Sequence, residues 1–129
     1  MSYRRGYNML EAVLAVFLFS IVVVFMMSLW AYYARSIEKS RNHMVATHLG
    51  ERALSETIAR GYLGAESAGP YTIDVEVTNG DVTSRIPYEW VVEVSEVEDG
   101  LKSILVRVWY PHQDERREVR FESLLFASN

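Results

Sequence analysis

The chain has 129 residues, half of them apolar, a formal net charge of −4 at pH 7 and no cysteine. Its apolar residues are unevenly distributed: the 23 residues from Ala12 to Ala34 include 21 apolar ones and no charge. As a helix this run would measure roughly 34 Å, which is enough to cross a bilayer core of about 30 Å. This composition excludes a purely soluble protein, and the lack of cysteine excludes disulfides, thiolate metal ligands and a cysteine nucleophile.

Charges on the two sides of the run bear on its orientation. The leader before Gly6 carries Arg4 and Arg5, and positive charge ahead of a span favours a cytoplasmic N-terminus. Basic residues also follow the run, and they weaken this inference; they are Arg35, Lys39 and Arg41. We expect the N-terminus in the cytoplasm and the rest of the chain across the membrane.

The apolar run belongs to a longer predicted helix. No glycine or proline occurs between Gly6 and Gly50, so nothing interrupts a helix through the run and beyond it. We predict one helix from about Tyr7 to about Arg60. Aromatic rings favour the headgroup region, and those at the end of the run mark where the helix leaves the membrane. The interface residues are Trp30, Tyr32, Tyr33 and Arg35.

After Arg35 the predicted helix becomes amphipathic, with apolar residues mostly three or four positions apart. These residues are Ile37, Met44, Val45, Leu49, Ala53, Leu54 and Ile58. A group of glycines and a proline then ends the helix and opens a loop. This group comprises Gly61, Gly64, Gly69 and Pro70. The residues that follow must cover the apolar face of the helix.

Four segments after residue 70 alternate apolar and polar residues, which is typical of strands with one buried face. Their apolar residues are Ile73, Val75 and Val77; Trp90, Val92 and Val94; Ile104, Val106, Val108 and Tyr110; and Val119 and Phe121. Asn79-Gly80 predicts a turn after the first strand. Pro87 can begin the second strand and Pro111 can end the third without the loss of a ladder bond.

The register of the two middle strands follows if their apolar faces must meet. A two-residue hairpin at Asp99-Gly100 would place Val92 opposite Arg107, with the apolar faces on opposite sides of the sheet. A three-residue loop of residues 98–100, with Gly100 in the left-handed conformation, brings the apolar partners together. The predicted pairs are Val97 with Leu101, Val94 with Ile104, Val92 with Val106 and Trp90 with Val108.

The predicted fold is α+β: a long N-terminal helix, transmembrane then amphipathic, packed against an antiparallel sheet of about four strands. We divide the chain into a leader (1–6), a transmembrane helix (7–34) and a head (35–129), which contains a helix (35–60) and the sheet (71–126). The sheet region is too small to be stable alone and should fold against the helix as one unit. Residues 61–129 carry six basic and 13 acidic groups, a net charge of −7, which argues against a nucleic acid partner.

Glu11 is a lone carboxylate one turn into the apolar run. A charge in hydrocarbon costs about 2.5 to 3.5 kcal/mol on insertion scales, so such a residue indicates a function and a partner. Glu11 also lies near the edge of the run, where snorkelling relieves most of that cost. On this residue alone both readings stay open.

The N-terminal sequence MSYRRGYNMLEAVLA resembles the prepilin leader of type IV pilins and pseudopilins. In that family a short basic leader ends in glycine, an aromatic residue or methionine follows, and a glutamate stands fifth in the mature chain before some twenty apolar residues. This sequence has Tyr7 where phenylalanine is commoner and Asn8 where threonine is commoner. Residues 88–94 and 100–111 are similar to the head of small minor pilins and of the minor I-type pseudopilin of type II secretion.

The resemblance implies a prepilin peptidase that cuts after Gly6 and methylates the new amine of Tyr7. It implies that Glu11 pairs with the N-terminus of a neighbouring subunit. The implied partners are other pilins or pseudopilins and an inner-membrane assembly platform, and the implied locations are the inner membrane, with a periplasmic head, and then a pilus or pseudopilus. Major pilins usually carry a helix-breaking proline near the position of Ser28, so we expect a minor subunit.

Three alternatives remain. The filament could be a secretion pseudopilus or a twitching or DNA-uptake pilus. The chain could also be an unprocessed single-pass membrane anchor for a periplasmic binding module; a secretory signal peptide fits less well, because its apolar region has only about 7 to 15 residues. An enzyme is the least favoured class. We expect no cofactor or metal, because His43 and His48 lie about 140° apart on a helix and His112 stands alone in a loop.

Overall fold

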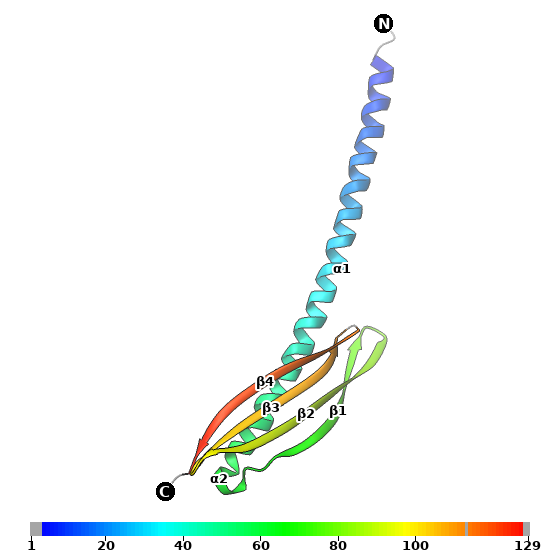
Figure 1. The fold of residues 1–129 in the computed structure, drawn as a ribbon. Helices are drawn as coiled ribbons and strands as arrows, with labels where there is room; N and C mark the ends of the chain where they lie inside the picture. The colour runs from blue at the N-terminus through cyan, green and yellow to red at the C-terminus, as the bar shows by residue number, and fades with distance from the viewer. Residues whose placement is uncertain (1–3, 113, 128–129) are drawn as a thin grey trace. The chain divides into compact units, whose positions relative to one another are not determined.

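The computed structural model describes residues 4–112 and 114–127 and confirms the α+β fold (Figure 1). The four strands form one antiparallel sheet in the order β1-β2-β3-β4, so each strand pairs with its neighbour in the chain. The elements are α1 (Arg4–Ala59), α2 (Gly61–Gly64), β1 (Ala68–Asn79), β2 (Val82–Glu98), β3 (Leu101–His112) and β4 (Glu115–Phe126). The chain divides between Glu38 and Lys39 into an N-terminal unit and a C-terminal unit.

In the N-terminal unit α1 is helical through the whole apolar run, and every described side chain from residue 8 to residue 38 is exposed. The two serines of the run satisfy their own hydroxyl groups within the helix. Ser20 donates to the carbonyl of Val16 at 2.8 Å, and Ser28 donates to that of Val24 at 3.0 Å. This helix is long and apolar enough to cross a membrane.

In the C-terminal unit α1 is most deeply buried along a row of small side chains, and the predicted residues Val45, Leu49 and Leu54 pack partly buried against the same core. The buried helix residues are Asn42, Ala46, Gly50, Ala53 and Thr57. Met44 and Ile58 are exposed, by 60% and 39%, so their predicted place in the core is wrong, as is that of Ile37. Spacings of three and four residues align the small side chains on one face of the helix and let large sheet residues approach its backbone.

At Gly50 a side chain of the sheet reaches the backbone of the helix. A Cβ atom at this position would overlap the ring of Phe121 on β4, with the ring carbon Cδ2 only 2.5 Å away. Glycine inside a helix costs about 1 kcal/mol relative to alanine. The contact with Phe121 explains why this residue stands in a helix that otherwise has none between Gly6 and Gly61.

The sheet contributes the large residues of the core. Tyr88, Ile104, Val106 and Val108 are completely buried, and Val92 and Tyr110 are 4% exposed. The predicted apolar faces of β2 and β3 therefore meet the helix. Of the predicted core residues of β1, Val77 is 8% exposed and Val75 packs partly buried against the core, whereas Ile73 is 42% exposed. Tyr88 was not among the predicted core residues.

The β2–β3 register confirms three of the four predicted pairs, Val94 with Ile104, Val92 with Val106 and Trp90 with Val108. The fourth, Val97 with Leu101, is wrong, because Glu98 pairs with Leu101 and the register shifts between Glu96 and Glu98. The hairpin thus has the two-residue turn Asp99-Gly100, with Gly100 at φ 81°, and Val97 is the extra residue of a β-bulge. The bulge places the apolar faces of β2 and β3 on the same side of the sheet. The predicted three-residue loop was expected to have this effect.

Several predicted boundaries also shift. The sheet begins at Ala68 instead of residue 71, and residues 61–64 form the short helix α2 instead of an open loop. The first turn is centred on Gly80 and Asp81, one residue later than predicted. Pro87 lies inside β2, opposite Asp74 of β1, and does not begin the strand.

We expect Gly50→Ala to lower the free energy of unfolding by about 1 to 2 kcal/mol, because overpacking against Phe121 outweighs the gain in helix propensity. Chemical unfolding of the full chain in detergent micelles, followed by tryptophan fluorescence, measures this change. In a Phe121→Leu background the same substitution should be neutral or stabilising. Stabilisation in the wild-type background would contradict the close contact.

Tyr88 buries a hydroxyl group that has no hydrogen-bond partner among the described residues. Burial raises the pKa of Tyr88 above its ordinary value of 10.0, the charge of Arg41 opposes this shift, and Tyr110, stacked at 5.9 Å between ring centroids, adds to it. Because the folded pKa is the higher one, stability due to neutral Tyr88 is present below pH 10 and is lost as the pH rises further.

We expect Tyr88→Phe to raise the free energy of unfolding by about 1 kcal/mol at pH 7, because it removes an unpaired buried hydroxyl group. Between pH 9 and about pH 11 the wild type should also lose more stability than the variant. Unfolding midpoints of both proteins at these pH values test the prediction. A clear loss of stability in the variant at pH 7 would show that the hydroxyl group is needed.

Candidate functional site

The candidate processing site lies at the start of α1. Gly6 and Tyr7 fall within the helix, whereas Met1, Ser2 and Tyr3 of the leader lie outside the described residues. The first four N–H groups of a helix have no partner in the preceding turn. Opening the backbone at Gly6 therefore breaks few hydrogen bonds.

Glu11 is exposed on α1, one helical turn after Tyr7. It is the one charged residue between Asn8 and Ala34. Within the described part of the chain no salt bridge involves it. Glu11 lies beyond the first turn of α1, outside the main reach of the helix dipole, and its exposed carboxylate is available for a cation presented from outside the helix.

The predicted interface residues surround the helix. Trp30, Tyr32 and Tyr33 are 79%, 75% and 66% exposed, and Arg35 is exposed as well. At about 100° per residue, Tyr32 and Tyr33 lie roughly 160° and 60° from Trp30 around the axis. These residues therefore share a level along the helix axis but point in different directions around it. Residues that lie in a headgroup region are expected to be arranged in this way.

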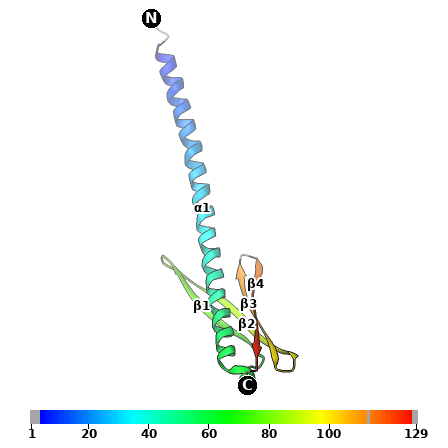
Figure 2. The same ribbon diagram turned by 90° about the vertical axis from the view of Figure 1, so that its left-hand side faces the viewer.

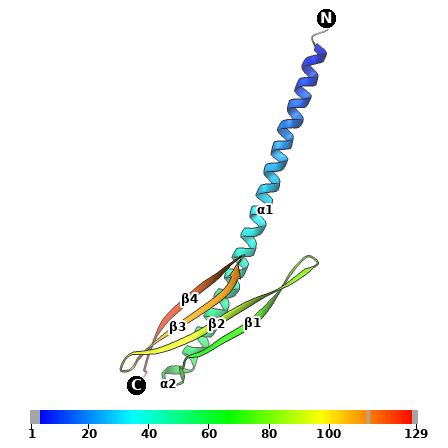
Figure 3. The same ribbon diagram turned by 45° about the vertical axis from the view of Figure 1, so that its right-hand side comes forward.

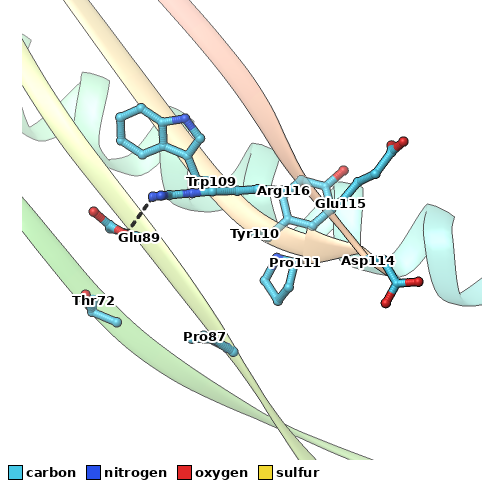
Figure 4. Close-up of a pocket in the computed structure, with 9 residues that line it drawn as sticks. All are labelled: Thr72, Pro87, Glu89, Trp109, Tyr110, Pro111, Asp114, Glu115 and Arg116. Atoms are coloured by element: carbon cyan, nitrogen blue, oxygen red, sulfur yellow. Dashed lines mark hydrogen bonds and ion pairs between the residues drawn. The ribbon is translucent and has the colours of Figure 1, made fainter.

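A hollow of about 380 Å³ lies at the opposite end of the sheet from the Asp99-Gly100 turn, where the β1–β2 and β3–β4 hairpins separate (Figure 4). Figures 2 and 3 show the tips of the two hairpins apart from each other. Pairing of β2 with β3 stops at Glu89 and Trp109. Continued in the same register, it would place Pro87 opposite Pro111, and both prolines line the hollow.

The direction of the backbone groups explains why these prolines separate the hairpins. Ser67 Oγ accepts a hydrogen bond from the N–H of Val94 at 2.8 Å and donates to its carbonyl at 3.2 Å, so these backbone groups point away from β3. Backbone groups alternate sides along a strand, so those of Pro87 point toward β3. Pro87 and Pro111 would form a pair that exchanges two hydrogen bonds, and neither has an N–H to donate. The same alternation means that neither proline removes a bond within its own hairpin.

The charged groups in and near the hollow are largely paired. Arg116 donates to Glu89 at 2.7 Å, and Arg107 forms a salt bridge with Glu93. The guanidinium carbons of Arg107 and Arg116 lie 5.4 Å and 5.1 Å from the centre of the Trp109 ring. These contacts order the outer face of the sheet, while the lining of the hollow keeps more acidic than basic residues: Glu89, Asp114 and Glu115 against Arg116.

The three histidines are separately placed. His43 Nδ1 lies 3.3 Å from the hydroxyl oxygen of Tyr110, His48 is exposed, and His112 is the last residue of β3, not a loop residue as predicted. Across residues 4–112 and 114–127, no group of three or more His, Asp or Glu residues could hold a metal ion.

The separation of the two hairpins at Pro87 and Pro111 was not predicted from the sequence. It could have been, because the predicted Val92–Val106 pair places Pro87 opposite Pro111 in the same register. The sequence analysis also missed the small-residue row on α1, which no periodicity of large apolar residues reveals.

Comparison with known proteins adds no further assignment: no family model, no curated protein and no solved structure matches this chain.

Proposed function

We propose that the protein is a minor pilin or pseudopilin, a structural subunit of a type II secretion pseudopilus or a type IV pilus. The observation that carries the proposal is the placing of Glu11, a lone charge on an exposed apolar helix, five residues after a glycine that ends a basic leader. The role is one of assembly without catalysis. The subunit is made as a single-pass inner-membrane precursor with a periplasmic head.

The exposed apolar surface of α1 supports assembly through this helix. Side chains such as Phe19 and Phe25, exposed by 68% and 64%, require lipid or other apolar helices around them. Ser20, Val24 and Ser28 recur every four residues and line a shallow groove on one side of the helix. Ser20 and Ser28 are the small residues of this groove, and small side chains on a helix face let a neighbouring helix approach closely. The same surface thus fits both the membrane and a bundle of subunits.

Glu11 supplies a reason for subunits to join in register. Cleavage after Gly6 would create a cationic amine on Tyr7, in a region otherwise free of positive charge. Two opposite charges withdrawn from water cost less together than apart. The amine of one subunit and Glu11 of another therefore favour one axial offset between neighbouring helices. Prepilin peptidase, the assembly platform and other pilin-like subunits are the proposed partners.

The mature protein should begin at Tyr7, because Gly6 precedes an aromatic residue at the family's distance from Glu11. Intact mass and N-terminal sequencing of protein from the native host decide this. Gly6→Leu should cause full-length precursor to accumulate in the membrane, whereas Ser2→Leu, a matched change within the leader, should be processed normally. A native chain that keeps residues 1–6 while the peptidase is active would favour the unprocessed membrane-anchored module instead.

Glu11→Gln should leave cleavage and insertion intact and reduce incorporation into the filament. Loss of the charge makes the free energy of membrane insertion more favourable by about 2 to 3 kcal/mol, so insertion is not impaired. The amide keeps the size of the side chain and removes the partner for a neighbour's amine. Co-purification with other filament subunits from membranes measures incorporation, with Glu38→Gln outside the apolar run as the control. Undiminished assembly of Glu11→Gln would identify Glu11 as a snorkelling residue.

A further inference from the structure

The two edges of the sheet differ in how they are protected against pairing with another chain. Edge strands commonly carry charges that discourage added strands. On β4, six of the eight residues from Glu115 to Glu122 are charged, with both signs present. The twelve residues of β1 include two charges, both acidic, and no lysine, and its one proline, Pro70, stands near the start of the strand. β1 is the less protected edge.

The backbone of β1 presents a row of free hydrogen-bonding groups. The backbone groups of Val94, and by alternation those of Trp90 and Tyr88, point toward β1. Their β1 partners, Tyr71 and Ile73, thus bond to β2. The residues between these partners point their N–H and C=O groups outward at the open edge. They are Thr72, Asp74, Glu76 and Thr78.

A trough runs between this edge and α1, and its lining combines apolar residues with Arg52, Glu56 and Arg60 of the helix. Two adjoining hollows of about 270 and 240 Å³ share the side chains of Ala53, Glu56 and Trp90. Their floor includes Tyr71 and Ile73, exposed by 49% and 42%. The trough lies on the helix side of β1, so a strand added to β1 would place every second side chain over it.

The charges on the outer face of β1 indicate the kind of strand that fits. Asp74 is exposed, and its cross-strand partner is Pro87, which cannot neutralise it. Glu76 already has a cation, since Arg85 donates to it at 3.0 Å. A second copy of β1 paired about Val75 would set Asp74 against Glu76, which is unfavourable. A basic residue opposite Asp74 is favourable.

We propose that β1 and the trough bind an extended segment of a partner protein, which adds a fifth strand with apolar side chains over the trough alternating with basic side chains beside Asp74. The backbone bonds of the open edge supply affinity, and the alternate side chains supply selectivity. This inference is independent of the processing of the N-terminus and of the role of Glu11.

The test uses the full chain in zwitterionic detergent micelles and two fluorescent nine-residue peptides, in which valine alternates with lysine or with glutamate. The lysine peptide should bind more tightly, and it should slow hydrogen exchange at the amides of Thr72, Asp74, Glu76 and Thr78. Asp74→Lys should weaken the lysine peptide about fivefold and strengthen the glutamate peptide. Asp81→Lys, the same charge change in the β1–β2 turn, should leave both affinities unchanged.

Three results would overturn the proposal. Equal effects of Asp74→Lys and Asp81→Lys would mean that binding follows net charge and not position. Binding without slowed exchange at the four outward amides would mean that the peptide occupies the trough in another form, such as a helix. Concentration-dependent protection of these amides in the protein alone would identify a second copy as the occupant.

Discussion

The C-terminal unit depends on the close approach of α1 to the sheet, which small side chains on the helix make possible. Ala46 and Gly50 bring no bulk of their own, so the core volume is filled from the sheet by residues such as Tyr88, Val106 and Phe121. Because the helix contributes small residues and the sheet large ones, the helix covers only part of the sheet. One helix over the middle of a four-stranded sheet cannot also cover its edges, and apolar side chains stay exposed on both edge strands: Tyr71 and Ile73 on β1, and Leu124 and Phe126 on β4.

Prolines shape the other end of the sheet. Pro87 and Pro111 face each other at a position where two ladder bonds would form, and the two hairpins separate there. Each hairpin keeps its own pairing to the tip, because β1–β2 pairs through Asn79 and Val82 and β3–β4 through His112 and Glu115. The sheet is therefore continuous near the Asp99-Gly100 turn and divided at the opposite end. The outer face near the division is ordered by arginine contacts with Trp109 and by ion pairs.

The surface of α1 differs between the two units. In the C-terminal unit α1 buries its small residues, and its exposed positions carry charges such as Arg52 and Glu56, which pair at 2.8 Å. In the N-terminal unit the described side chains, from residue 8 on, are all exposed, and from residue 12 to residue 34 all but two serines are apolar. Such a surface is stable only in lipid or among similar helices, which is why a lone carboxylate at its start has a large effect on where the helix can reside. The proposed role in filament assembly rests on that contrast.

The sequence by itself determined the elements and the faces they present. Hydrophobic periodicity distinguished the apolar helix from the strands, and the requirement that apolar faces meet paired Val92 with Val106. The resemblance of the N-terminal sequence to a prepilin leader made Gly6 and Tyr7 the candidate processing site. Periodicity indicates which residues share a face. It does not indicate how closely two faces approach, or where the extra residue of a β-bulge brings the apolar faces of two strands to the same side of the sheet. Only the tertiary structure decided that Gly50 meets Phe121, that Val97 forms a bulge beside a two-residue turn, and that Tyr71 and Ile73 of β1 stay about half-exposed. These features depend on distances between elements far apart in the chain, which no local pattern records.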